Sequence, residues 1–472
     1  MPVDAERSRM NQTNKTQCVH CKRNYSTGKN RCPYCGGYQE EIRGKTARRD
    51  TGAKRAIILL LFVILAITGV SLAALQLGGT PQDGSLAAAG PSGNYGQEAG
   101  EAGYPEPPIE PQPVEIRIQF AGDILLHRGP IEAARTGTNT FDFRPFLRDI
   151  KPFIDGDLTL VNMETPVDVL GENQDITTWP LFNAPFEILE ALDYAGFNHI
   201  IAANNHAFDR GFSGLVATAE NFERAGLDFT GIYVNPEATQ VPTILDVNGI
   251  YVGIIAYTDS VNGLEPLVPQ EMLPYAVRRF RSHVLDDVPA IAEDIANLRA
   301  QGAELVIVSL HWGAEYVNAP TDMQRQIARA LAQNGADVVM GNHAHVVQPI
   351  EWYEREDGSR SLLIYSLGNF LADQTRLNPP IERTQFGKLV SLQVIREPDG
   401  TIHLGLCEVL PTLCMRDTTG NTLGIVDGIS VMPLFDGELP DFVTNAELRN
   451  WGRRAYEHVR NIVGEEFIMQ RP

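Results

Sequence analysis

Three short apolar runs, each followed at once by asparagine or histidine, limit what this chain can fold into. We expect each run to be a buried strand: Phe197–Ala203, Leu305–Leu310 and Ala336–Met340. Each leads into a polar motif: Asn204-Asn-His206, His311-Trp-Gly313 and Gly341-Asn-His-Ala-His345. Because ligands bind beyond the carboxyl ends of strands in open α/β sheets, the motifs predict a polar site at these ends.

Strand-like and helix-like segments alternate along most of the chain. Helices are predicted at Pro185–Ala195, Phe212–Ala225, Val288–Gln301 and Asp322–Gln333. The alternation indicates a parallel or mixed sheet covered by helices. From Ile350 onward, strand-like runs and a turn at Glu397–Gly400 predict antiparallel strands that complete a second sheet. The expected fold class is α/β (α+β), a four-layer sandwich of helix, sheet, sheet and helix.

Charge divides the chain of 472 residues into two parts. Residues 1–55 contain 13 Lys and Arg and five acids, which leaves 26 of the 39 basic and 54 of the 59 acidic residues for the remainder. A basic head and an acidic body indicate two different environments.

Four cysteines in the basic head form two paired knuckles. Cys18 and Cys21 make the first, and Cys32 and Cys35 the second. This spacing suits four thiolates around a structural zinc ion, and we expect a small zinc ribbon over residues 18–37 with residues 1–17 disordered. Two disulfides are the alternative, which a reducing compartment disfavours. We expect a protein partner for this module and no nucleic acid.

Residues 56–77 contain no charge and are long enough to cross a hydrocarbon core of about 30 Å. The basic segment 38–55 precedes them, so the positive-inside rule places the N-terminus in the cytoplasm. A cleaved signal peptide is disfavoured because the run begins more than fifty residues into the chain. The prediction is a single-pass protein of the cell membrane.

Residues 78–113 are rich in Gly, Pro, Ala and Ser and predict a disordered stalk. We expect the main extracytoplasmic domain at residues 114–415 and a C-terminal extension with one helix at residues 416–472. Cys407 and Cys414 are equally compatible with a disulfide and with a buried free pair.

Six side chains follow predicted strands closely enough to converge: Asp123, Glu164, Asn205, His311, His343 and His345. Carboxylate, amide and imidazole ligands suit Mn²⁺, Fe²⁺ or Zn²⁺, whereas the absence of thiolates from this set argues against copper(I) or an iron–sulfur cluster. Such a site lowers the pKa of bound water. The prediction is one or two divalent metal ions.

These motifs occur in a fixed order together with Gly122-Asp-Ile-Leu-Leu-His-Arg128, Asn162-Met-Glu164, Asn204-Asn-His-Ala-Phe-Asp-Arg-Gly211 and Ser366-Leu-Gly-Asn-Phe370. The ordered set resembles the CapA family, also called PgsA, of poly-γ-glutamate capsule synthesis, which is similar to calcineurin-like metallophosphoesterases. The resemblance covers roughly Ile116–Phe370 and implies a metallophosphatase-like sandwich.

The resemblance also implies roles for single residues. Asp123, Asn205, His311, His343 and His345 match metal ligands, and Glu164 takes the place of a bridging aspartate. His206, oriented by Asp209, matches a catalytic acid or substrate contact.

The first motif departs from the phosphoesterase pattern, because Leu125 stands where a histidine is usual. His127 is a possible substitute, and Arg128 is expected to meet an anionic substrate or a site carboxylate. Trp312 is interpreted as a pocket wall, and Asn369 as either a substrate contact or a tie for its loop. The run Arg278–His283 is either a solvated face or a docking patch for a polyanion.

Three functions remain open at this stage. The first is a membrane-anchored CapA-like component that acts on or exports an anionic polymer such as poly-γ-glutamate, with synthase or export proteins as partners. The second is a general envelope phosphoesterase, and the third a non-catalytic scaffold. The acidic body repels a polyanion at long range, so any polymer contact has to be local and sensitive to salt.

Overall fold

The computed structural model describes most of the chain after residue 111 and two short strands before it. The described residues are 15–17, 24–26, 112–168, 175–374, 381–418, 420 and 428–471. Strands β1 (Lys15–Gln17) and β2 (Asn24–Ser26) pair antiparallel. The four ribbon cysteines, the apolar run 56–77 and nearly all of the stalk 78–113 lie outside the described residues. Within the described part, no helix is both long and apolar enough to cross a membrane.

The first of two large sheets has eight strands in the order β16-β15-β14-β3-β4-β5-β6, with β13 paired to β3. Strands β3 to β6 run parallel, and β14 to β16 join antiparallel. The bounds are β3 (Val114–Leu125), β4 (Leu158–Met163), β5 (His199–Ile201), β6 (Asp228–Thr230), β13 (Asn369–Ala372), β14 (Phe386–Arg396), β15 (Ile402–Asp417) and β16 (Gly428–Pro433).

The second sheet has six strands in the order β11-β12-β10-β9-β8-β7. The bounds are β7 (Thr243–Val247), β8 (Ile250–Thr258), β9 (Leu305–His311), β10 (Val338–Asn342), β11 (Ile350–Glu354) and β12 (Arg360–Ile364). The expectation that all strands after Ile350 complete a separate sheet is wrong. Strand β12 instead runs parallel to β10, β11 pairs antiparallel with β12, and only later strands join the eight-stranded sheet.

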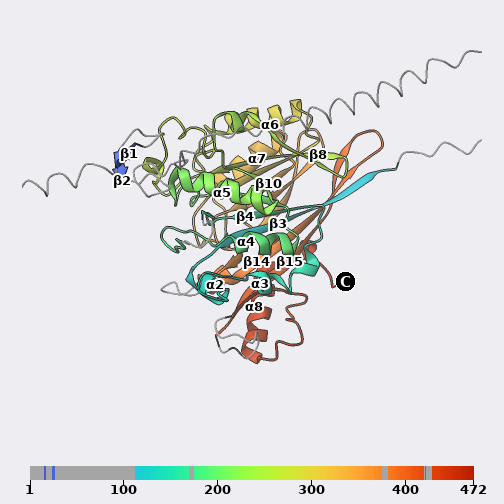
Figure 1. Cartoon of the computed structure of the whole chain (residues 1–472). Helices are drawn as coiled ribbons and strands as arrows, with labels where there is room; N and C mark the ends of the chain where they lie inside the picture. Colours follow the sequence, from blue (N-terminus) through green and yellow to red (C-terminus); the bar gives the residue numbers. More distant parts are fainter. Residues whose placement is uncertain are drawn as a thin grey trace, which may run out of the picture. The chain divides into compact units, whose positions relative to one another are not determined.

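Helices lie against both sheets. Their bounds are α2 (Arg128–Ala133), α3 (Arg144–Leu147), α4 (Glu187–Ala195), α5 (Gly211–Ala225), α6 (Val288–Ala300), α7 (Asp322–Gln333) and α8 (Ala446–Val463). Short 3-10 turns occur at Lys151–Phe153, Glu237–Gln240, Glu265–Leu267, Glu382–Gln385 and Glu465–Phe467. Helices α6 and α7 contact the six-stranded sheet, whereas α2, α3, α5 and α8 contact the eight-stranded one (Figure 1). This mixed α/β architecture agrees with the predicted fold class.

Alternation along β9 shows how the sequence builds these layers. Leu305 and Ile307 belong to the core between the sheets, while Val306, Val308 and Leu310 pack in the core beneath α6 and α7. Successive side chains of a strand point to opposite faces, so a strand buried on both faces is apolar throughout. The continuous apolar run that predicted this strand therefore reflects its position between two layers.

The C-terminal residues extend the same body. Strand β16 pairs with β15, and α8 contacts β14 and β15. Asn445 caps α8 by accepting hydrogen bonds from the backbone N–H groups of Glu447 and Leu448. Cys407 and Cys414 are buried and free, so the pair carries no disulfide.

Candidate metal centre

The predicted site residues come together at the ends of strands from both sheets. Asp123 belongs to β3 and Glu164 follows β4, both in the eight-stranded sheet. His311 ends β9, and His343 and His345 follow β10, both in the six-stranded sheet. The site therefore lies between the sheets, and not along the edge of a single sheet as the strand-end argument assumed.

The turn after β10 has a conformation that side chains other than glycine rarely adopt. His343 has φ 90° and His345 has φ 55°. Such left-handed residues cost about 1–3 kcal/mol and cluster at functional sites. Hydrogen bonds hold the turn: Ser366 Oγ donates to the Val346 carbonyl at 3.0 Å, and buried Lys388 Nζ donates to the Gln348 carbonyl at 2.8 Å.

His345 lies between two buried carboxylates. Its Nδ1 is 3.3 Å from Asp123 Oδ2, 3.7 Å from Glu164 Oε2 and 3.0 Å from Asn369 Oδ1. Asn369 is itself fixed, because its Nδ2 donates to Gln374 Oε1 and to the Thr384 carbonyl, each at 2.8 Å. The Asn369 side chain thus orients the His345 imidazole through Oδ1, while its Nδ2 is held by two further hydrogen bonds.

His311 is the centre of a second group of contacts. Its Nε2 lies 2.9 Å from Asn205 Oδ1, 3.1 Å from His343 Nδ1 and 3.4 Å from Glu164 Oε1. One imidazole nitrogen holds one proton or one lone pair, so it satisfies only one of these neighbours. A metal ion is the usual centre around which such atoms gather.

Burial and mutual charge shift the pKa values strongly. Burial raises the pKa of Glu164 to about 8 against the opposing charge of His345. Burial also acts to lower the pKa of His345, but the carboxylates of Glu164 and Asp123 outweigh it and raise this pKa to about 10. Burial holds the pKa of His311 down to about 3. Without an ion, the centre therefore keeps protons that metal ligation has to displace.

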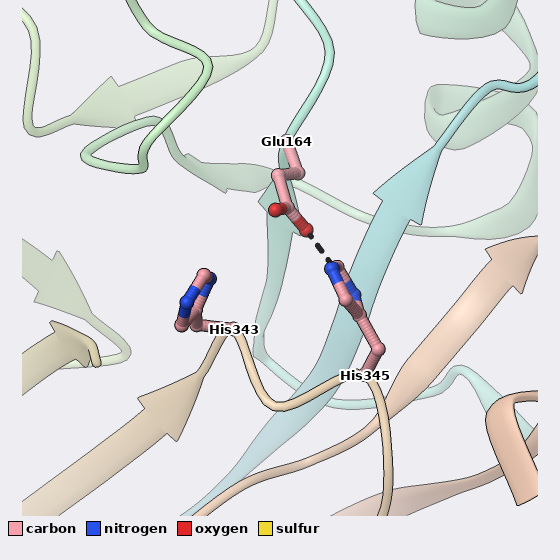
Figure 2. Close-up of side chains that lie close together, drawn as sticks. All are labelled: Glu164, His343 and His345. Carbon is pink, nitrogen blue, oxygen red and sulfur yellow. Dashed lines mark ion pairs between the residues drawn. The ribbon is translucent and has the colours of Figure 1, made fainter. Parts of the chain in front are cut away.

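The residues present fit a divalent metal ion. Potential ligand atoms of Glu164, His343 and His345 all lie within 4.8 Å of one another, and Figure 2 shows the three side chains facing a common space from two elements. Both carboxylate oxygens of Glu164 and Oδ2 of Asp123 are buried without a hydrogen-bond partner. Because buried carboxylate oxygens normally have partners, these orphaned atoms are what a bound cation would satisfy.

Beside this centre, His206 forms a dyad with a buried carboxylate. Its Nδ1 lies 2.8 Å from Asp209 Oδ2, which also accepts the backbone N–H of Phe182 at 2.7 Å. The Phe182 ring packs edge-on against His206, with centroids 4.8 Å apart. Asp209 and Phe182 thus fix the imidazole, which lines the adjoining pocket.

A pocket of about 590 Å³ opens beside the centre. Its lining comprises Leu125, His127, Trp179, Pro180, Leu181, Phe182, Asn205, His206, Asn262, Leu264, Glu315, Tyr316, His345, Asp373 and Gln374. His127 therefore lines the pocket, and burial lowers its pKa to about 4, so it is neutral at physiological pH.

Two predicted site residues lie elsewhere. Trp312 is fully buried in the core beneath α6 and α7, where its Nε1 donates to the Tyr365 carbonyl at 3.1 Å, so it is not a pocket wall. It follows His311 directly, and neighbouring residues of an extended segment point to opposite sides. Arg128 is exposed in the first turn of α2 and is absent from the pocket lining.

Several contributing residues were not singled out from the sequence. Asn162 Nδ2 donates to Asp123 Oδ1 at 2.7 Å and so orients that carboxylate. Its spacing of two from Glu164 within a strand run is the signal that could have found it. Tyr316, Asn262 and Gln374 line the pocket from loops, where no periodic pattern marks them.

The fold and the centre define an α/β protein with two packed sheets and a buried carboxylate–imidazole cluster fit for a metal ion. The chain belongs to the bacterial capsule synthesis protein PGA_cap family, whose model matches residues 117–374. The resemblance to the CapA family is thereby confirmed.

Two curated relatives are both named CapA. The chain is 30% identical over 260 residues to the PGA biosynthesis protein CapA of Bacillus subtilis (strain 168), covering 55% of this chain and 64% of that protein. It is 28% identical over 264 residues to the capsule biosynthesis protein CapA of Bacillus anthracis, covering 55% and 60%. The chain thus spans less than two thirds of the length of both relatives. Among solved structures, it is similar to the calcineurin-like phosphoesterase YfkN from Bacillus subtilis, with TM-score 0.35, 17% identity, and 74% and 100% coverage.

Proposed function

We propose that this protein acts in the biosynthesis or export of an anionic capsule polymer such as poly-γ-glutamate, through a metal-dependent, hydrolase-like site. The observation that carries the proposal is the cluster of Glu164, His343 and His345 with orphaned buried carboxylate oxygens, found in a chain of the PGA_cap family. A purely structural role does not account for buried carboxylates that meet histidines but accept no hydrogen bond at these oxygens.

Glu164, His343 and His345 would hold the ion, with Asp123, Asn205 and His311 beside them. A bound divalent ion would polarise the scissile group and lower the pKa of a water ligand. Asn369 and Asn162 hold His345 and Asp123 in place through the hydrogen bonds described above. The His206–Asp209 dyad would carry a proton to or from the substrate at His206 Nε2.

The N-terminal part of the proposal rests on sequence alone. An apolar span at residues 56–77 and the basic segment before it would anchor the protein in the cell membrane with the body outside. A zinc ribbon formed by Cys18, Cys21, Cys32 and Cys35 would contact a partner in the cytoplasm, such as a polymer synthase or exporter.

Elemental analysis of the full-length protein in detergent tests the site. We compare wild type with a His343→Ala, His345→Ala double variant and with His283→Ala, an exposed histidine of the basic run. Beyond the zinc expected in the N-terminal ribbon, we expect Mn, Fe or Zn in wild type and in His283→Ala, and no further metal in the double variant. Hydrolysis of oligo-γ-glutamate, assayed beside simple phosphoesters, is expected to disappear with the metal.

The substrates separate the remaining functions. Turnover of phosphoesters alone would replace the polymer role by a general envelope phosphoesterase. An inactive wild type that contains no metal beyond the ribbon zinc, but still binds polymer, would leave only a scaffold.

A further inference from the structure

The pocket beside the metal centre lacks the basic side chains expected of a site that binds a polyanion. None of its lining residues is Lys or Arg. Its histidines include His127, whose pKa burial lowers to about 4. A row of carboxylates entering this pocket would meet no cationic side chain except the protonated centre or its ion.

Apart from His345 of the metal centre, the charged lining residues are two acids, Asp373 and Glu315. Asp373 is buried and bonded to Arg416, with Nη1 to Oδ2 at 2.9 Å, so its charge is compensated. Glu315 is exposed, and no ion pair to it occurs among the residues that the structure describes. The lining therefore includes one exposed carboxylate, Glu315, which hydrogen-bonds the Tyr316 side chain and has no cationic partner among the described residues.

An aromatic side chain stands at the same pocket. Trp179 is 73% exposed, and Leu181 beside it is 40% exposed. An exposed indole face attracts a cation, and the attraction adds to that of a nearby carboxylate. Tyr316 supplies a second ring, and its phenol accepts a hydrogen bond from Gln374 Nε2 at 3.4 Å. Carboxylate and aromatic rings together suit an ammonium group.

The size of the pocket points to a chain end. A volume of about 590 Å³ lies in the range of sites that hold a small ligand, so the pocket has room for only a short stretch of a polymer. A γ-linked glutamyl chain carries a free carboxylate on every unit, but an ammonium group only at its amino end. The carboxyl end adds a further negative charge, which this lining would repel.

Resting on the proposed function, we propose that the pocket binds the ammonium-bearing end of the polymer, with Glu315 as its counter-charge and Trp179 as its aromatic wall. The carboxylates of later units remain outside, where exposed Arg128 follows the lining residue His127. The site then acts at one end of the chain and does not act at internal bonds.

Three forms of one short oligo-γ-glutamate test this inference by calorimetry on metal-loaded, full-length protein. One has both ends free, one has an acetylated amino end, and one has an amidated carboxyl end. We expect acetylation to weaken binding at least tenfold and amidation to change it less than threefold. Glu315→Gln is expected to remove the penalty of acetylation while metal content stays unchanged. Glu354→Gln, an exposed acid at the end of β11, serves as the matched control.

Each other outcome overturns the inference in a distinct way. Loss of binding on amidation alone would show that the carboxyl end enters. Equal binding of all three forms would show that internal units are bound, and loss of metal in Glu315→Gln would assign Glu315 to the metal centre. Failure of every form to bind a fully metal-loaded protein would reject the polymer as ligand, and with it the proposed function.

Discussion

The metal centre and the basic run Arg278–His283 differ in how their charges are satisfied. In the basic run each arginine has an acidic partner: Arg278 with Asp294 at 2.8 Å, Arg279 with Glu265 at 3.0 Å, and Arg281 with Asp287 at 2.7 Å. In the centre, Glu164 has no hydrogen-bond partner for either oxygen. The densest cationic stretch of the body is thus internally neutralised, whereas the less conspicuous carboxylate is left for a ligand.

This contrast favours the solvated face over the docking patch, the two interpretations of Arg278–His283 that the sequence left open. A run of arginines indicates a polyanion patch only if its charges are free, and here they are paired with neighbouring acids. Local charge density is visible in a sequence, but pairing depends on residues brought close by the fold. Unsatisfied buried atoms are therefore the better guide to function.

The sharpest test exchanges one glutamate for glutamine in each region. Glu164→Gln keeps the shape but removes a ligand charge from the centre, so we expect metal affinity to fall more than about 100-fold, beyond the usual effect of an outer-shell partner. Glu265→Gln, which changes the acidic partner of Arg279 in the basic run, should leave the metal affinity unchanged. Chelator competition measures both, and equal affinities for the two variants would remove Glu164 from the centre.

A smaller effect is expected at Asn369. Its Oδ1 lies 3.0 Å from His345 Nδ1, so Asn369→Ala should release the imidazole and reduce metal affinity about 10–100-fold. Ser282→Ala is the matched change in the basic run, because it also removes a buried polar side chain, one that donates to Asp259. Similar affinities for Asn369→Ala and wild type would mean that Asn369 only ties down its loop.

The pH dependence of metal binding follows from the centre alone. Glu164, with a pKa of about 8, and His345, with a pKa of about 10, both hold protons at neutral pH in the metal-free protein. Each displaced proton lowers the apparent affinity by up to about tenfold per pH unit of acidification, so affinity should rise with pH. Titration calorimetry in buffers of different ionisation enthalpy measures the protons released. An affinity that stays flat from about pH 6.5 to about pH 8.5 would contradict these shifts.

The smallest effect is expected from Arg281→Gln. Arg281 is exposed, and an exposed ion pair contributes about 0–1 kcal/mol. The free energy of unfolding, measured by urea denaturation, should therefore change by less than about 1 kcal/mol. The affinity for oligo-γ-glutamate should stay the same. A marked loss of polymer binding would restore the docking-patch interpretation of the basic run.

Much of the fold could be predicted where local signals were complete. Helix α7 has the bounds predicted for it, Asp322–Gln333, and in the structure Thr321 and Gln324 form a capping box at its start. The turn at Glu397–Gly400 also forms, with Gly400 N donating to the Glu397 carbonyl at 2.9 Å. It was harder to predict which sheet a given strand joins. The apolar pattern of β12, for example, is the same whether the strand pairs parallel or antiparallel.

The candidate site was predictable in its members but not in its arrangement. Strand ends located His311, His343 and His345, whereas their approach to Glu164 depends on how two sheets pack. The error at Trp312 was avoidable, since the alternation that turns His311 towards the centre turns its neighbour away. Glu315 belongs to a loop and carried no signal until the pocket was known.

Glu164 follows a strand of one sheet, whereas His343 and His345 follow a strand of the other. A bound ion would therefore link the two sheets through its ligands. It would bind only after the two sheets have docked. An ion at 100 times its Kd would then add about 2.7 kcal/mol to the free energy of unfolding. Removing the ion should weaken the packing between the two sheets before either sheet itself unfolds. Hydrogen exchange measured with and without metal would therefore report how the two sheets assemble.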